Sequence, residues 1–194
     1  MKIGIFGGTF DPPHIGHLIL AEFVRDEIGL DEVWLVPALD PPHKLDRHKT
    51  PADIRYEMVK LACGNDAFIR PSDIDLVHSR RPSYTIDLLD EISLNFPDNE
   101  FVQIIGEDSI AEFTLWKSWN EILKKYRIIG LRRRGIDLTC VNNEVISSVE
   151  ILNNPLIELS STEIRKRIIN GKSVRYMVSE RVWDFIFSNK VYKK

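Results

Sequence analysis

The sequence predicts an α/β protein with a Rossmann-like, doubly wound parallel sheet and a helical C-terminal extension. Short apolar runs alternate with amphipathic stretches along the chain, which is the pattern of a parallel sheet covered by helices. Two glycines, Gly7 and Gly8, break the first apolar run, and a predicted helix begins at Ile15. No repeat, low-complexity segment or linker interrupts the 194 residues, so we expect a single domain over residues 1–194.

The first part of the chain contains three predicted strands and two predicted helices. Gly29 is placed to end the first helix, and Pro37 closes the second strand. Thr50, Pro51 and the acidic Asp53 predict a helix start, with Gly64 as its stop. The expected elements are a strand at Ile3–Phe6, a helix at Ile15–Ile28, a strand at Val33–Val36, a helix from Thr50 to about Cys63 and a strand at Phe68–Ile69.

The second part continues the alternation and ends in helices. Ser118 with Glu121, and Ser160 with Glu163, have the spacing of capping boxes that begin helices. The stretch from Arg132 to Val145 has no period and is expected to be loop. The expected elements are a helix at Tyr84–Leu94, a strand at Phe101–Ile105, a helix from Ser118 to about Lys124, a strand at Tyr126–Leu131, a helix after Ser160 and a last helix that includes Val182–Phe187.

Composition excludes several classes of protein. A net charge of −3 argues against a protein that lives on nucleic acid, because binding a phosphate backbone needs a basic surface. The N-terminus lacks the apolar run of a signal peptide, and no apolar run is long enough to span a membrane. We therefore expect a cytoplasmic protein with no nucleic-acid or membrane partner, in which Cys63 and Cys140 are free core thiols. Whether it acts alone or as a homo-oligomer stays open.

The loop after the first strand carries the strongest chemical signal. It reads GGTFDPPHIGH from Gly7 to His17. The glycines allow close approach to a phosphate, and the helix start that follows favours anions. His14 and His17 are three residues apart, so both imidazoles project from one side of the first turn and can donate hydrogen bonds to phosphate oxygens. A helix-capping pair or a two-histidine metal site are the alternatives.

A second phosphate-binding stretch lies near the other end of the chain. In SSTEIR, from Ser160 to Arg165, the simplest role is an N-cap, but the hydroxyls of Ser161 and Thr162 and the guanidinium of Arg165 also reach the start of the helix. GTFDPPHIGH resembles the signature loop of the nucleotidyltransferase superfamily, and SSTEIR resembles the motif with which its adenylyltransferases hold the pyrophosphate end of ATP. Class I aminoacyl-tRNA synthetases share the first motif, but they are much longer and carry a KMSKS loop that is absent here.

Three further stretches resemble the bacterial nicotinate-mononucleotide adenylyltransferases of this superfamily. They are PPHK at 41–44, PSYTID at 82–87, and IGED at 105–108 followed by Trp116. With these, the resemblance covers nearly the whole chain, which it implies is one nucleotidyltransferase domain. It implies transfer of AMP from ATP to nicotinate mononucleotide, giving nicotinate adenine dinucleotide and pyrophosphate in NAD biosynthesis. No protein nucleophile is needed, because the phosphate of the acceptor can attack ATP in a single in-line displacement.

The resemblance also implies a role for each matching residue. The expected catalytic residues are His14, His17 and Arg165. The expected ATP-binding residues are Gly7, Gly8, Thr9, Phe10, Gly16, Gly106, Asp108, Ser161 and Thr162. The expected acceptor-binding residues are Lys44, Tyr84, Thr85, Trp116 and Arg133, although the sequence departs from the family at Arg132–Arg134 and leaves open which arginine faces the site. We expect Mg²⁺ to be carried by ATP and no metal site built by the protein alone.

Each of these residues has a plainer alternative. Trp116 can be a core aromatic, Lys44 a solvated surface lysine, and Arg132–Arg134 a wet basic loop. A relative that adenylylates phosphopantetheine is the nearest rival enzyme, but it has threonine where His14 stands. A catalytically silent nucleotide-binding module is the rival from another class, and intact His14, His17 and Arg165 argue against it.

Overall fold

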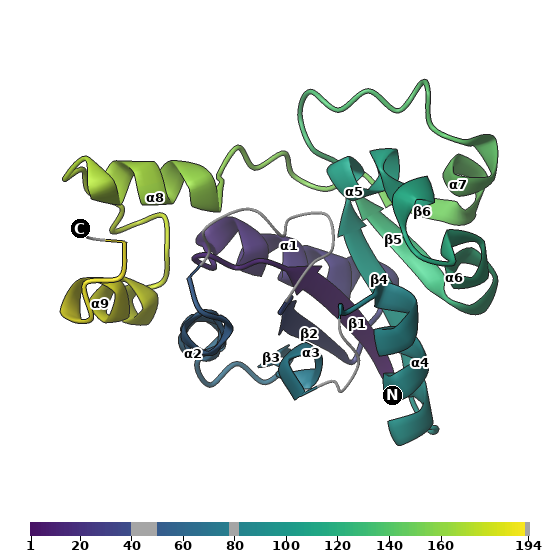
Figure 1. Ribbon diagram of the computed structural model, residues 1–194, viewed down its shortest axis with the longest axis horizontal. Coiled ribbons are helices and arrows are strands. Elements are labelled where there is room, and N and C mark those ends of the chain that lie inside the picture. Colours follow the sequence, from purple (N-terminus) through teal and green to yellow (C-terminus); the bar gives the residue numbers. More distant parts are fainter. Residues whose placement is uncertain (40–49, 78–81, 193–194) are drawn as a thin grey trace.

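The computed structural model describes residues 1–39, 50–77 and 82–192 (Figure 1). The expected acceptor-binding residue Lys44 lies outside the described residues. In the described part, six parallel strands form one sheet in the order β3-β2-β1-β4-β5-β6. The strands are β1 (Lys2–Gly8), β2 (Glu32–Pro37), β3 (Ile69–Pro71), β4 (Glu100–Gly106), β5 (Arg127–Leu131) and β6 (Val149–Leu152). The expected doubly wound α/β fold is confirmed.

The strand order changes direction between β1 and β4, which are paired with each other at the centre of the sheet. In folds of this type, ligands bind beyond the carboxyl ends of the strands at that switch point. Gly7 and Gly8 end β1, and Gly106 ends β4. The glycine loops singled out from the sequence therefore lie at the switch point.

Helices connect the strands and extend the C-terminus. They are α1 (Ile15–Ile28), α2 (Ala52–Cys63), α3 (Ile74–Val77), α4 (Thr85–Asn95), α5 (Glu107–Ala111), the 3₁₀ turn η2 (Phe113–Leu115), α6 (Trp119–Lys125), α7 (Asn143–Ser148), α8 (Ser161–Ile169) and α9 (Glu180–Ser188). Figure 1 shows α8 and α9 to one side of the sheet, with α9 next to α2. These two helices form the expected C-terminal extension.

Three apolar clusters hold these layers together. One face of the sheet packs against α4, α5 and α6 through side chains such as Ile5, Leu89 and Ile122. The other face packs against α1 and α2 through side chains such as Val24, Val33 and Val59. A third cluster joins Met58 of α2 to Ile164 of α8 and Val182 of α9. The C-terminal extension is thus packed onto α2 by a core of its own.

Several local expectations were wrong. The loop expected at 132–145 contains the start of α7, and β6 follows it as an edge strand that the sequence reading omitted. The cap of α2 is Pro51, one residue after the expected Thr50. Ser118 is the N-cap of α6, but its hydroxyl makes no capping bond, because Asn120 Oδ1 accepts from the Glu121 N–H instead. Cys63 is buried as expected, whereas Cys140 is exposed.

Candidate active site

Two cavities of about 330 Å³ each open at the carboxyl ends of β1 and β4. They are adjacent, because the loops after these two strands line both of them. The residues common to both are Gly7, Gly8, Thr9, Gly106, Asp108 and Ser109. A molecule in one cavity is therefore separated from a molecule in the other only by these loops.

The first cavity lies between the loop after β1 and the start of α8. His14 and His17 line one wall, and Ser161, Thr162 and Arg165 line another. GGTFDPPHIGH and SSTEIR, nearly 150 residues apart in the sequence, are joined directly: Ser161 Oγ donates to the Pro12 carbonyl at 2.8 Å. The walls of this cavity therefore carry several hydrogen-bond donors, which are the groups that bind an anion.

The imidazoles of His14 and His17 are stacked, with ring centroids 3.6 Å apart and planes 17° apart. The His14 backbone N–H donates to His17 Nδ1 at 3.1 Å. Since Nδ1 accepts this bond, the proton of a neutral His17 lies on Nε2. The ring of the buried Phe10 packs edge-on against the ring of His17, with the two ring centroids 4.8 Å apart. The ring of His17 is therefore fixed in both position and tautomer.

Both imidazoles are neutral at physiological pH. Burial, followed by the nearby positive charge of Arg133, lowers the pKa of His14 from 6.5 to about 4. Burial, His14 and Arg133 lower the pKa of His17 well below its usual value. His14 Nδ1 is buried and has no hydrogen-bond partner among the described residues. A neutral imidazole keeps one N–H group, so each ring of the pair can donate a hydrogen bond to a phosphate oxygen.

The side chain of Arg165 connects the loop after β1 to the first turn of α8. Its Nη1 donates to the Asp11 carbonyl at 2.6 Å, and its Nη2 donates to Thr162 Oγ1 at 3.3 Å. Ser160 caps α8 as expected, by accepting from the Glu163 N–H at 3.2 Å. The helix start, the hydroxyls and the guanidinium thus face the same cavity as the histidine pair.

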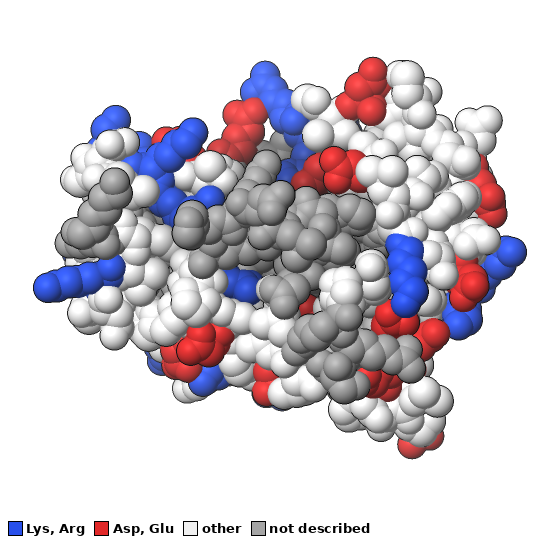
Figure 2. All heavy atoms as spheres, viewed as in Figure 1, with Lys and Arg blue, Asp and Glu red and all other residues white. Residues whose placement is uncertain are grey.

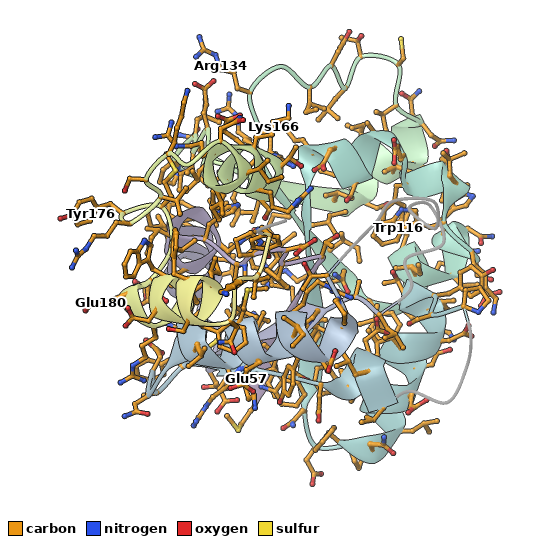
Figure 3. All side chains as sticks on the ribbon, turned by 60° about the vertical axis from the view of Figure 1, so that its left-hand side comes forward. Glu57, Trp116, Arg134, Lys166, Tyr176 and Glu180 are labelled. Atoms are coloured by element: carbon orange, nitrogen blue, oxygen red, sulfur yellow. The ribbon has the colours of Figure 1, made fainter. Side chains whose placement is uncertain are left out.

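The second cavity extends over the face of the sheet that α4 covers. Tyr84 and Thr85 at the start of α4 line it, together with Trp116. Trp116 also packs on Phe113 with ring centroids 4.9 Å apart, so its two expected roles, cavity wall and core aromatic, coexist. Figure 3 shows Trp116 on the side of the molecule away from Tyr176 in the C-terminal extension.

The structure distributes the expected site residues between the two cavities. Gly106 and Asp108 lie at their junction. Arg133, expected near the acceptor, lines the first cavity and not the second, and it forms a half-exposed ion pair with Asp108 at 3.0 Å. The other expected ATP-binding residues, namely Gly7, Gly8, Thr9, Phe10, Gly16, Ser161 and Thr162, all line the first cavity.

Gln103 and Arg55 are among the buried polar residues at or near the cavities that the sequence patterns did not anticipate. Gln103, 4% exposed, lines the second cavity from β4 and donates from Nε2 to the carbonyls of Ile5 and Ile104. Arg55, 1% exposed, donates to the carbonyls of Thr9 and Thr50, and so ties α2 to the loop after β1. The available signal was a polar residue inside an otherwise apolar strand or on the buried face of a helix.

Over residues 1–39, 50–77 and 82–192, no group of three or more His, Cys, Asp and Glu side chains is arranged to hold a metal ion. Asp108 is the carboxylate at the junction of the cavities, and one carboxylate beside bound phosphates suits Mg²⁺, which usually keeps several waters. None of the helices described is long and apolar enough to cross a membrane.

A doubly wound sheet with a stacked histidine pair and a capped helix at its switch point defines a phosphate-handling nucleotide enzyme of the α/β class. The family model for cytidylyltransferase-like proteins matches residues 5–167. The chain is 36% identical to a probable nicotinate-nucleotide adenylyltransferase of Desulfitobacterium hafniense, over 99% of this chain and 96% of that one. It is 38% identical to one from Cytophaga hutchinsonii, over 99% and 98%. The protein belongs to the cytidylyltransferase-like family and, within it, to the nicotinate-nucleotide adenylyltransferases.

Solved structures share the fold at lower sequence identity. The nicotinic acid mononucleotide adenylyltransferase of Plasmodium falciparum in complex with NaAD superposes with a TM-score of 0.80 at 20% identity, over 98% of this chain and 97% of that one. A putative nicotinate-nucleotide adenylyltransferase of Vibrio parahaemolyticus superposes with a TM-score of 0.69 at 22% identity, over 98% and 94%. At these sequence identities, both structural similarities support the fold alone.

Proposed function

We propose that the protein transfers AMP from ATP to nicotinate mononucleotide, with pyrophosphate as the second product. The observation that carries this proposal is the pair of adjacent cavities, one rich in phosphate donors and one walled by aromatic rings. The names of the relatives supply the acceptor. The reaction is a step in NAD biosynthesis, and we expect it in the cytoplasm.

ATP occupies the first cavity. The donors of His14 and His17 face its phosphates from one wall, while Ser161, Thr162 and Arg165 hold the β- and γ-phosphates from the other. Asp108 would hold the Mg²⁺ that accompanies ATP, and the ion would supply neutralisation of charge on the phosphate oxygens.

The acceptor occupies the second cavity, with its pyridine ring on Trp116 and beside Tyr84 and Thr85. A positively charged pyridinium favours the face of an aromatic ring. Its 5′-phosphate extends to the junction at Gly7–Thr9 and attacks the α-phosphorus of ATP in line. The histidine donors stabilise the negative charge that grows on the phosphate oxygens, and no side chain forms a bond to phosphorus.

The test is pyrophosphate release from ATP with three acceptors measured side by side: nicotinate mononucleotide, nicotinamide mononucleotide and phosphopantetheine. We expect the highest kcat/KM with the nicotinate acceptor. Faster turnover with phosphopantetheine would replace the proposed acceptor. Absence of turnover with all three would favour a silent nucleotide-binding module.

A further inference from the structure

The C-terminal segment reaches back to the signature loop. Tyr192 Oη donates to Asp11 Oδ1 at 2.7 Å, although the two residues are 181 positions apart. Figure 1 shows this end of the chain lying between α8 and α9. Lys190 and Tyr192 both have positive φ, at 53° and 71°, a conformation that non-glycine residues adopt at a cost. The backbone therefore turns sharply at Lys190 and Tyr192, and the Tyr192 hydroxyl lies beside Asp11.

Asp11 is 3% exposed and lines the first cavity. Its two carboxylate oxygens have different partners: Oδ1 accepts from Tyr192, and Oδ2 accepts from the Thr50 backbone N–H at 3.3 Å. Burial, and then the neighbouring Asp11 carboxylate, raise the pKa of the Tyr192 hydroxyl above its usual range, so it remains a donor. A buried carboxylate needs such partners, because an unpaired charge is costly to bury.

Arg165 stands next to the same carboxylate without binding it closely. Its Nη1 is 3.9 Å from Asp11 Oδ2, compared with 2.6 Å from the Asp11 carbonyl oxygen. Its Nη2 reaches Thr162 at the cavity wall. If Tyr192 did not donate to Asp11, Arg165, which among the described residues already lies 3.9 Å from Asp11 Oδ2, would be drawn to the carboxylate, and its guanidinium would leave its present position beside Thr162.

We propose that Tyr192 is a positioning residue for ATP binding: it occupies the Asp11 carboxylate and thereby leaves the Arg165 guanidinium directed at the phosphates. The role assigned to Arg165 rests on the proposed function. Tyr192 itself acts through Asp11 and Arg165 and touches no substrate.

The chain supplies a matched control for this inference. Tyr126 Oη donates to Asp90 Oδ1 at the same 2.7 Å, between α6 and α4, and lines neither cavity described above. Tyr192→Phe and Tyr126→Phe each remove one hydroxyl that donates to a carboxylate. A purely structural role predicts that both variants lose stability and neither loses ATP affinity.

The experiment measures the Kd for a non-hydrolysable ATP analogue with Mg²⁺ and without acceptor, by titration calorimetry. We expect Tyr192→Phe to raise this Kd about tenfold, the equivalent of one weakened charge-assisted hydrogen bond, and Tyr126→Phe to leave it unchanged. In the Arg165→Ala background, Tyr192→Phe should add nothing. An unchanged Kd in Tyr192→Phe, or an equal added effect in the Arg165→Ala background, would overturn the inference.

A measurement on the unaltered protein keeps the inference testable if Tyr192→Phe does not fold. Coupling is reciprocal, so bound ATP analogue should slow amide hydrogen exchange at Val191 and Tyr192 and leave the segment around Tyr126 unchanged. Equal exchange at Val191 and Tyr192 with and without the analogue contradicts the coupling. Because no acceptor is present, failure of transfer to all three acceptors would refute the proposed function and leave these results standing.

Discussion

The side chain of His17 is held by three separate contacts. The His14 N–H fixes its Nδ1, the His14 ring covers one face, and Phe10 supports its edge. Such a side chain loses little freedom when a phosphate binds, so its donor is already in place for the transition state. This is the residue-level basis for the expected catalytic role.

His17→Ala should therefore leave a folded protein whose kcat is lower by about 10²–10³-fold, the usual effect of removing one transition-state donor. Steady-state kinetics with saturating ATP and acceptor measure this, and circular dichroism checks the fold. A variant that turns over within a few-fold of the unaltered protein would remove His17 from the mechanism.

His14 should make the folded state sensitive to acid. Its pKa is about 4 when folded and 6.5 as the ordinary value, so it is neutral in both states above pH 6.5. Between pH 6.5 and 4 the unfolded chain takes up a proton that the folded chain resists, and stability falls as pH is lowered. The loss attributable to His14 is about 3 kcal/mol at pH 4, from 1.36 kcal/mol per pKa unit.

Urea unfolding at pH 7.0, 5.5 and 4.5 measures this dependence. His14→Gln cannot titrate and should show a shallower decline than the unaltered protein, with the difference confined to pH below 6.5. Parallel declines in the two proteins would mean that the buried imidazole does not contribute.

At the scale of elements, the start of α8 contributes both to the stability of the helix and to the wall of a cavity. Ser160 caps the helix and, together with Ser161 and Thr162, lines the first cavity. Ser179 caps α9 in the same way, by accepting from the Val182 N–H at 3.4 Å, but it lies outside both cavities. Substitutions at these two serines therefore allow an effect on helix stability to be distinguished from an effect on ligand binding.

Ser160→Ala and Ser179→Ala should each lower stability by about 1 kcal/mol, the typical effect of losing an N-cap. Only Ser160→Ala should also raise the KM for ATP, because fraying of α8 displaces Ser161 and Thr162. Thermal unfolding and ATP titrations of both variants decide this. An equal KM effect in Ser179→Ala would point to a general loss of order in the C-terminal extension.

The elements that the sequence predicted well are those with strong local signals. Gly29 and Gly64 both end their helices with positive φ, and the apolar runs at β1, β2, β4 and β5 are strands. The four residues of β6 carry only two buried side chains and pair along one edge, so they lack a distinctive pattern. The five-residue α5 is likewise stabilised by its place after β4 more than by its composition.

The candidate site shows the same division. The residues of GGTFDPPHIGH and SSTEIR were recognisable because their types and spacing suit phosphate binding. Tyr192, Arg55 and Gln103 act through contacts with residues far away in the sequence, and local patterns carry no information about such partners. The assignment of Arg133 to the first cavity likewise depends on how β5 and β4 are paired.

At the scale of the whole molecule, the proposed function assigns one substrate to each of the two cavities. Figure 2 shows Lys and Arg side chains on the part of this face formed by the C-terminal extension, with acidic and basic groups mixed elsewhere. Lys166 of α8, and Lys172 and Arg175 between α8 and α9, are exposed. The aromatic wall at Trp116 lies in the other cavity. Changes in one cavity should therefore affect one substrate.

Trp116→Ala should raise the KM for the acceptor and leave the KM for ATP nearly unchanged. A base stacked on an aromatic side chain is worth about 1–3 kcal/mol, so the expected increase is roughly 5- to 150-fold. Kinetics with each substrate varied in turn measure the two values. Equal increases for both substrates, together with a large fall in Tm, would assign Trp116 to the core alone.

The arrangement also predicts transfer without an adenylylated enzyme. The acceptor brings its own phosphate nucleophile, and among the described residues the hydroxyls of Ser161 and Thr162 bond to groups that are not bases: Ser161 Oγ donates to a carbonyl, and Thr162 Oγ1 accepts from Arg165. Labelled pyrophosphate should not enter ATP when the acceptor and dinucleotide are absent, and a chiral α-phosphorothioate should be inverted. Exchange without acceptor, or retention at phosphorus, would demonstrate a covalent intermediate.

The wall shared by the cavities sets a rule for designing ligands. Six residues line both chambers, so a compound that carries an adenosine-like group at one end and a pyridine-like group at the other can fill both at once. When one such compound binds, translational freedom is lost once, whereas it is lost twice when two separate molecules bind. After one group of the compound has bound, the other group is held close to its own cavity and binds at a high effective concentration. A tether that crosses at Gly7 meets open space, because nothing lies within 4 Å of the position that a Cβ would take there. Gly7, at which the proposed function brings the reacting phosphates together, is thus also the crossing point for a two-headed inhibitor.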